Sequence, residues 1–191
     1  PSTPIVAIVT HPEAVGRIAP TSMPHPPRRR ASLSRDPAQR RASPHVFGFQ
    51  VPASPERDLL EDGAAEVGDI LREWSATPSW PDDHTVATYR AGMLLLNTAH
   101  CALEYHRWAL RSIPRPDGIR YANRMKTPIQ APVLHLQGGS DPTVLPSSAQ
   151  GSEQFVAGLY QYTEFPGVGH FPHEESPQDV HEALLAWLAR L

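Results

Sequence analysis

The stretch Val133-Leu-His-Leu-Gln-Gly-Gly-Ser-Asp141-Pro142 decides the fold of this chain. It is a short apolar run of β type that ends in small residues and an aspartate. A second run, Tyr162-Thr-Glu-Phe-Pro-Gly-Val-Gly-His170-Phe-Pro172, ends in small residues and a histidine. Two such runs with a helical stretch between them predict neighbouring parallel strands, whose carboxyl ends lie at one edge of a sheet. We therefore expect Asp141 and His170 to meet at that edge.

The C-terminal part of the chain predicts a regular alternation of strands and helices. Strands are expected at 132–137 and 159–165, and helices at about 146–157 and 177–191. The last helix begins with an N-cap serine and a proline, in Ser176-Pro-Gln-Asp179. The fold class is thus α/β, with a parallel sheet flanked by helices. One apolar stripe of the last helix should face the sheet, formed by Val180, Leu184, Trp187, Leu188 and Leu191.

The middle of the chain has a different character. From about Pro26 to Thr127 there is no strong β pattern, and helices are expected at 55–74, 84–96 and 99–113. Three parts follow from this: residues 1–25 as the end of an N-terminal core portion, 26–127 as a helical cap or lid, and 128–191 as a C-terminal core portion that carries the acid and the base.

Composition excludes several classes of function. The chain has 191 residues, of which 40% are hydrophobic and 19% are charged, as in globular proteins. A net charge of −3 gives no field that attracts nucleic acid or anionic lipid, and no apolar run approaches the roughly 20 residues of a membrane-spanning helix. The single Cys101 cannot form an internal disulfide. We expect a cytoplasmic protein with neither a nucleic-acid nor a membrane partner.

One basic cluster stands out, at Arg28-Arg-Arg30 together with Arg35, Arg40 and Arg41. A nucleic-acid interface would carry aromatic side chains among the arginines, and here none are interleaved. We interpret the cluster as a solvated helical face.

Asp141 and His170 are the candidate catalytic residues. Taken singly, each has an ordinary structural interpretation, Asp141 as a turn before a proline and His170 as a packed histidine. As a pair they match an imidazole whose Nδ1–H is held by a buried carboxylate while Nε2 is free to take a proton. A metal site at His170, His173 and Glu174 is the alternative, but it lacks a distant ligand of clear identity. We expect neither metal nor cofactor.

With these motifs the chain resembles the α/β-hydrolase family, and within it the capped branch of epoxide hydrolases and haloalkane dehalogenases. The resemblance is carried by Gly138-Gly-Ser-Asp-Pro142, by Gly167-Val-Gly-His-Phe171 with Glu174-Glu-Ser-Pro177, and by the exit Met23-Pro-His-Pro26 into a helical cap. It implies that Asp141 orients the base. It also implies that His170 activates water against a covalent ester intermediate, formed on a small apolar organic substrate.

The sequence departs from the family pattern at the nucleophile. That residue, an Asp or Ser, follows a strand in a Gly-rich elbow, and no such elbow occurs here. By the family order, residues 4–14 correspond to the helix after the elbow, so the missing segment would precede Pro1. We therefore expect a partial fold without its N-terminal strands, and a fragment that does not turn over. Its exposed sheet edges should promote self-association.

A second departure lies in the cap. Two segments, Phe47-Gly-Phe-Gln-Val-Pro52 and Leu103-Glu-Tyr-His-Arg-Trp108, resemble those where epoxide hydrolases carry the tyrosines that polarise the epoxide. Those positions hold His45 and His106 here. A neutral imidazole differs from a phenol as a donor, so this role is not transferred. Tyr105 and Tyr89, one position or a few turns away, are alternative donors, but we expect them to pack between cap and core.

Two other functions stay open at this point. A serine esterase of the same fold would share the acid and the base, and only the residue in the elbow would distinguish it. A non-catalytic binding protein would keep an apolar pocket under the cap without performing chemistry.

Overall fold

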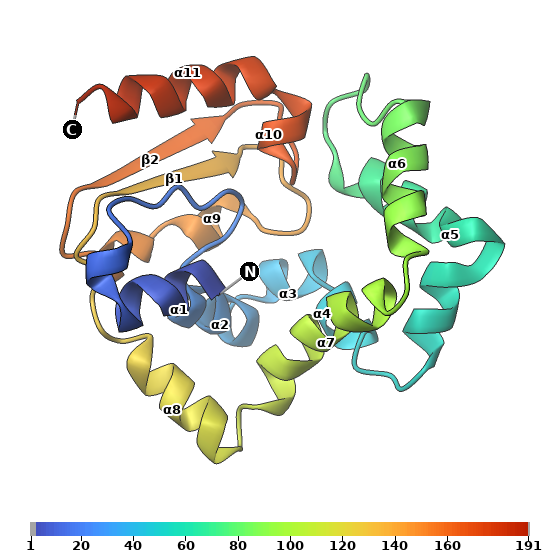
Figure 1. Ribbon diagram of the computed structural model, residues 1–191, viewed down its shortest axis with the longest axis horizontal. Helices are drawn as coiled ribbons and strands as arrows, with labels where there is room; N and C mark the ends of the chain where they lie inside the picture. Colours follow the sequence, from blue (N-terminus) through green and yellow to red (C-terminus); the bar gives the residue numbers. More distant parts are fainter. Residues whose placement is uncertain (1–2, 191) are drawn as a thin grey trace.

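The sheet is small and parallel. The computed structural model describes residues 3–190, in which β1 (Val133–Gly138) pairs with β2 (Tyr160–Phe165) from Val133 opposite Tyr160 to Gly138 opposite Phe165. On the other side of β1, the segment 18–21 makes two parallel bridges, Ile18 to Val133 and Thr21 to Leu136. Within the described residues the sheet is therefore incomplete, as expected. The carboxyl ends of both strands point toward the helices of the cap (Figure 1).

Helices make up most of the remaining chain. Before the sheet lie α1 (Thr3–Thr10) and a 3-10 turn (Pro12–Ala14). The middle of the chain forms α2 (Pro26–Arg35), α3 (Pro37–Ala42), α4 (His45–Gly48), α5 (Ser54–Trp74), α6 (Asp83–Met93), α7 (Thr98–Arg111) and α8 (Pro116–Arg124). After β1 come α9 (Pro146–Ala149), a 3-10 turn (Ser152–Phe155), α10 (Pro172–Glu175) and α11 (Pro177–Leu188). None of the described helices is long and apolar enough to cross a membrane.

The helix expected at about 146–157 is wrong in extent. The chain forms only α9 and a separate 3-10 turn there, because Gln150 leaves the helical region and Gly151 has a φ of 89°. A left-handed residue of this kind ends a helix, and glycine adopts it without steric cost.

The last helix covers one face of the sheet. Val180 and Trp187 of α11 are buried against Leu134, Leu136 and Phe165, and Leu184 packs at the margin. Leu188, however, is 42% exposed, so it does not belong to the stripe as predicted. Leu191 lies outside the described residues. Ser176 stands at the N-cap position, but its side chain contacts the Asp179 carboxylate instead of a backbone N–H.

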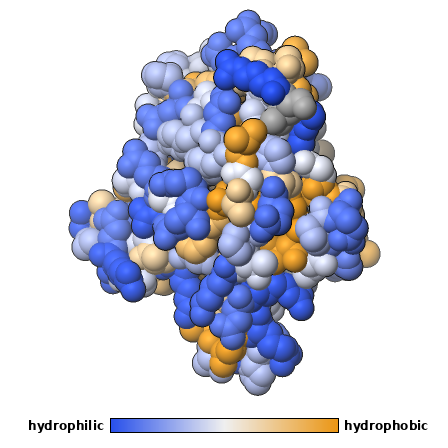
Figure 2. All heavy atoms as spheres, turned by 90° about the vertical axis from the view of Figure 1, so that its left-hand side faces the viewer, coloured by the Kyte–Doolittle hydropathy of each residue, from blue (hydrophilic) through white to orange (hydrophobic). Residues whose placement is uncertain are grey.

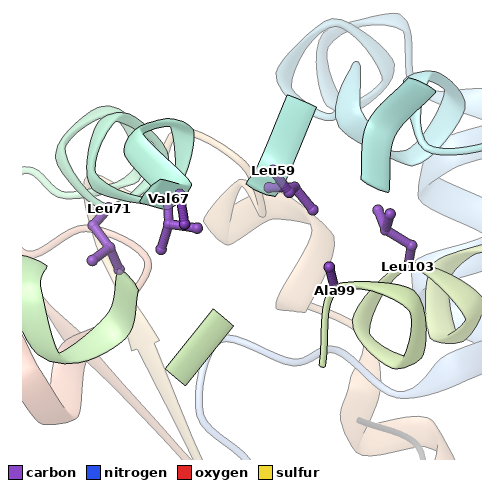
Figure 3. Packing of buried hydrophobic residues seen from close by; sticks show 6 residues of the cluster. Leu59, Val67, Leu71, Ala99 and Leu103 are labelled. Atoms are coloured by element: carbon purple, nitrogen blue, oxygen red, sulfur yellow. The ribbon is translucent and has the colours of Figure 1, made fainter. Parts of the chain in front are cut away.

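The predicted cap, residues 26–127, has its own core, separate from that of the sheet. Apolar side chains of α5 meet those of α7, and Figure 3 labels Leu59, Val67, Leu71, Ala99 and Leu103. A kink interrupts α5, because residues 61–64 have non-helical backbone angles. Arg90 of α6 donates to the carbonyls of Asp62 and Gly63, both at 2.8 Å. These bonds satisfy groups that the kink removes from the helix.

A buried arginine joins the two ends of the cap. Arg107 of α7 is 3% exposed and donates to the carbonyls of Phe49 and Val51, at 2.8 and 2.9 Å. It also forms a two-point pair with the carboxylate of Glu56. This hydrogen bond, opposed by burial, lowers the pKa of Glu56 to about 2. Such a fork fixes the start of α5 against α7.

The face at the amino ends of the strands shows hydrophobic residues, some of them adjacent, among hydrophilic ones (Figure 2). Exposed apolar groups are normal for a folded domain. Self-association through this surface or through the sheet edge remains a prediction.

Replacing Leu136 by alanine tests the core around the sheet. This β1 side chain is 1% exposed and touches the α11 cluster, so the free energy of unfolding should fall by about 2–5 kcal/mol in urea titrations. Leu185→Ala is the matched control, because Leu185 is 67% exposed and its loss should cost less than about 0.5 kcal/mol. Equal losses for the two variants would contradict this packing.

Two buried histidines, His25 and His135, and two half-buried ones, His45 and His106, predict acid sensitivity. Burial lowers the pKa of His25, His106 and His135 to about 4 and that of His45 to about 3. Below about pH 6.5 these histidines are protonated in the unfolded chain but still neutral in the folded chain. The free energy of unfolding should therefore fall as the pH drops toward 4. Each histidine contributes up to about 1.4 kcal/mol per pH unit in this window.

The histidine of β1 offers the direct measurement. His135 is 1% exposed, and its Nδ1 lies 3.0 Å from the Tyr160 hydroxyl. In urea titrations at pH 7, 6 and 5, His135→Gln should show a shallower pH dependence than the parent chain. His181→Gln, at an exposed position of α11, should keep the parent slope. An unchanged slope in His135→Gln would contradict the lowered pKa of His135.

Candidate active site

Asp141 lies just beyond the carboxyl end of β1, and its side chain is fully enclosed. Its Oδ1 accepts hydrogen bonds from Thr143 N and Val144 N, both at 2.8 Å, and lies 3.0 Å from Thr143 Oγ1. Burial by itself would raise the pKa of this carboxyl. The hydrogen bond and charge of His170, together with the backbone N–H groups of Val144 and Thr143, outweigh burial and lower that pKa below its ordinary value. Asp141 is therefore a buried anion.

His170 lies against this anion. The structure places His170 Nδ1 2.8 Å from Asp141 Oδ2, and the imidazole is 21% exposed. A buried carboxylate only accepts, so the imidazole donates its Nδ1–H. Nε2 makes no hydrogen bond to any residue in the described part of the chain, which leaves it available as a proton acceptor. The sequence predicts that Asp141 and His170 meet, and the structure places them in contact. Their catalytic role stays a proposal.

Two glycines allow the loops to approach this closely. A Cβ on Gly138 would lie 1.8 Å from the carbonyl oxygen of Gly169, and one on Gly169 would lie 2.5 Å from Ala76 N. Backbone N–H groups connect the same segments, with Ser140 N donating to Val168 O at 2.9 Å. Three segments are therefore in direct backbone contact: the loop after β1 that carries Asp141 (residues 139–145, the acid loop), the loop after β2 that carries His170 (residues 166–171, the base loop), and the end of α5.

The acid loop is also held from the cap side. Gln39 of α3 is fully buried, and its Nε2 donates to Thr143 O at 2.7 Å. Its Oε1 accepts from Leu145 N at 2.9 Å and from Ser148 Oγ at 2.5 Å. Ser43 donates its hydroxyl to the same Thr143 carbonyl at 2.6 Å. Sequence reasoning missed both Gln39 and Ser43, because an isolated Gln or Ser on a polar helix carries no distinguishing signal.

The cap histidines lie near the base. The rings of His45 and His106 are edge to face with centroids 5.9 Å apart, and His45 is 4.6 Å from the Trp74 ring. Trp74 in turn lies 5.4 Å from the His170 ring, at 90°. Burial, followed by the nearby cationic groups, lowers the pKa of His45 to about 3 and of His106 to about 4. Both are neutral at pH 7, so neither supplies an imidazolium proton.

The two cap tyrosines, Tyr89 and Tyr105, contact other residues than the Asp141–His170 pair. Tyr89 is 38% exposed, and its hydroxyl donates to Glu174 Oε1 at 3.2 Å, which links α6 to α10. Tyr105 packs its ring edge to face on His106, with centroids 5.7 Å apart.

The basic cluster is not simply a solvated face, which corrects one expectation. Arg29 turns inward, where its Nη2 donates to Ser43 Oγ at 3.0 Å and its Nη1 is enclosed without a partner among the described residues. Burial lowers the pKa of Arg29 to about 10, and the charge of Asp141 opposes this shift. Arg28 binds the carbonyls of Ser147 and Gln150, whereas Arg30 is exposed. A helical face of three arginines does not reveal which guanidinium turns inward.

Comparisons with known proteins identify the fold. No family model matches the sequence, and no curated protein matches it. Among solved structures, an epoxide hydrolase of Bacillus megaterium in complex with an inhibitor has a TM-score of 0.77 at 21% identity, covering 95% of this chain and 63% of its own. Cfl2 of Burkholderia cenocepacia has a TM-score of 0.75 at 19% identity, with 94% and 59% covered.

Two further structures agree on architecture. An epoxide hydrolase of the α/β-hydrolase superfamily from metagenomes of hot environments has a TM-score of 0.66 at 22% identity, covering 91% of this chain and 59% of its own. A Salmonella enterica protein described as a candidate acyltransferase has a TM-score of 0.79 at 18% identity, with 95% and 58% covered. The chain therefore has a partial α/β-hydrolase fold of epoxide-hydrolase-like architecture, which confirms the predicted fold, and it spans 58% to 63% of the length of these structures.

Asp141→Asn tests the buried anion. An amide keeps one acceptor oxygen and replaces the other by an NH2 group. Either the N–H groups of Thr143 and Val144 or the Nδ1–H of His170 therefore lose their acceptor. The free energy of unfolding in urea should fall by about 1–3 kcal/mol. Asp69→Asn is the control, because this α5 carboxylate is 64% exposed and pairs with Arg72 at the surface. If both variants unfold like the parent chain, Asp141 is not held as described.

Proposed function

From the α/β-hydrolase fold as premise, we propose that this chain carries the acid and base of an epoxide-hydrolase-type enzyme. The observation that carries the proposal is the 2.8 Å contact between His170 Nδ1 and the enclosed carboxylate of Asp141, at the carboxyl edge of the sheet. The substrate class would be a small apolar organic molecule.

The roles follow from the geometry. Asp141 holds the imidazole through Nδ1–H and stabilises the imidazolium that forms when Nε2 takes a proton from water. That water then hydrolyses an ester between the substrate and a carboxylate nucleophile. The described residues contain no hydroxyl, thiol or carboxylate that hydrogen-bonds Nε2. The nucleophile would therefore come from outside residues 3–190.

A serine esterase is the second candidate. The same acid and base would serve it, and the structural likeness to a candidate acyltransferase is the observation that favours acyl chemistry. The binding-protein alternative is favoured by the neutral His45 and His106, which stand where the resemblance expects phenols. Location in the cytoplasm stays a prediction of the sequence.

A reconstituted enzyme tests the proposal. The chain would be fused to the segment of the Bacillus megaterium epoxide hydrolase that it does not cover, and assayed with styrene oxide and with p-nitrophenyl acetate. We expect the unfused chain to show no turnover. The fusion should hydrolyse the epoxide, and His170→Ala should abolish this activity because the ester is no longer hydrolysed.

Controls separate the alternatives. His173→Ala, three residues away and exposed, should leave the rate unchanged. Hydrolysis by the unfused chain that disappears in His170→Ala would contradict the expected lack of a nucleophile. A folded fusion whose activity is indifferent to His170 would refute the role of the base, and a fusion that binds substrate without turnover would favour the binding protein.

A further inference from the structure

One buried carboxylate outside the acid–base pair contacts both neighbours of His170. Glu175, at the end of α10, is 9% exposed. Its Oε2 accepts from Gly169 N at 2.9 Å, and its Oε1 accepts from Phe171 N at 3.0 Å. The backbone N–H groups of the residues before and after His170 are thus both bound by a single side chain. The proposed mechanism assigns no role to this carboxylate.

The same carboxylate reaches the segment that leaves the cap helix α5. Oε2 also accepts from Ala76 N at 2.9 Å and from Thr77 N at 3.1 Å, and it lies 3.0 Å from Ser75 Oγ. Residues 75–77, called here the cap hinge, directly follow the last residue of α5. One oxygen therefore joins the cap hinge to the base loop.

Backbone contacts reinforce this junction. His170 N donates to Trp74 O at 2.8 Å, and the Trp74 ring packs edge to face on the imidazole. A Cβ on Gly169 would lie only 2.6 Å from Trp74 O. Because no side chain separates the two segments, a shift of the cap hinge moves the base loop directly.

We propose that Glu175 is a positioning residue that makes the orientation of His170 depend on a seated cap. It rests on the proposed function, because it assigns His170 the part of the base. With the hinge in place, Glu175 holds residues 169 and 171, and the imidazole keeps its Nδ1–H on Asp141. When residues 75–77 move away from Glu175, the base loop loses its contact with the end of α5 and the imidazole of His170 can rotate.

The chemistry requires a carboxylate at this position. The backbone groups that contact the two oxygens of Glu175 are all N–H donors: three donate to Oε2 and one to Oε1. Only a carboxylate offers an acceptor at both of these positions. Burial would raise the pKa of Glu175, but the N–H groups of Ala76, Gly169 and Phe171 lower it below the ordinary value, so the side chain stays charged. In Glu175→Gln the amide oxygen can serve the hinge side, and the NH2 group then faces the Phe171 N–H.

Amide hydrogen exchange of the 191-residue chain, followed by NMR, tests the junction. In Glu175→Gln the exchange of Phe171 N–H should accelerate by about tenfold or more, while Ala76 and Gly169 change less, because a bond to a charged acceptor is lost on one side only. In Glu175→Ala all three should accelerate. Glu174→Gln is the matched control, since this neighbouring carboxylate binds the exposed Tyr89 hydroxyl instead of the base loop.

Two spectroscopic signals separate positioning from simple stabilisation. The downfield proton resonance of His170 Nδ1–H, and the nuclear Overhauser contact between the His170 and Trp74 rings, should be present in the parent and in Glu174→Gln. Both should weaken or vanish in Glu175→Gln. A uniform acceleration of exchange throughout the chain with both signals retained would overturn the inference.

The outcomes stay distinct from those of the proposed function. None of these signals needs turnover, so a failed hydrolysis assay leaves the positioning test intact. If Glu175→Ala does not fold, the isosteric Glu175→Gln decides alone. A Glu175→Gln chain that folds with unchanged exchange at Phe171 would refute the claim.

Discussion

A buried negative charge must be surrounded by donors, and this constraint organises the molecule at the edge of its sheet. Asp141 draws in the backbone of residues 143 and 144 and the imidazole of His170. Glu175 does the same for the two neighbours of that imidazole and for the segment after α5. Leaving either carboxylate without its donors would cost several kcal/mol, so segments far apart in the sequence are held in one arrangement.

The fold and the central pair were accessible to sequence reasoning because they depend on short, strong patterns. An apolar run, small residues and an ionisable group identified both strands to within about one residue, since a buried parallel strand leaves few other choices. The supporting residues were not accessible. Gln39 and Ser43 act across sequence separations of about 100 residues, as does Glu175 toward Ala76, and no local pattern records such a contact.

The errors have physical causes as well. The helix after β1 is shorter than predicted because the backbone turns left-handed at Gly151 and separates α9 from the 3-10 turn. The arginine cluster was assigned to solvent because composition averages over a helix face, whereas Arg29 turns its guanidinium inward to Ser43. The first difference follows from a local property of glycine, whereas the second arises where tertiary contacts decide which side chain turns inward.

The glycine contacts at 138 and 169 leave no room for a side chain between the acid loop, the base loop and the end of α5. The spacing of these three segments is consequently resistant to evolutionary drift, because any residue with a Cβ would push them apart. An alanine at either position would therefore strain the 2.8 Å contact between Asp141 and His170.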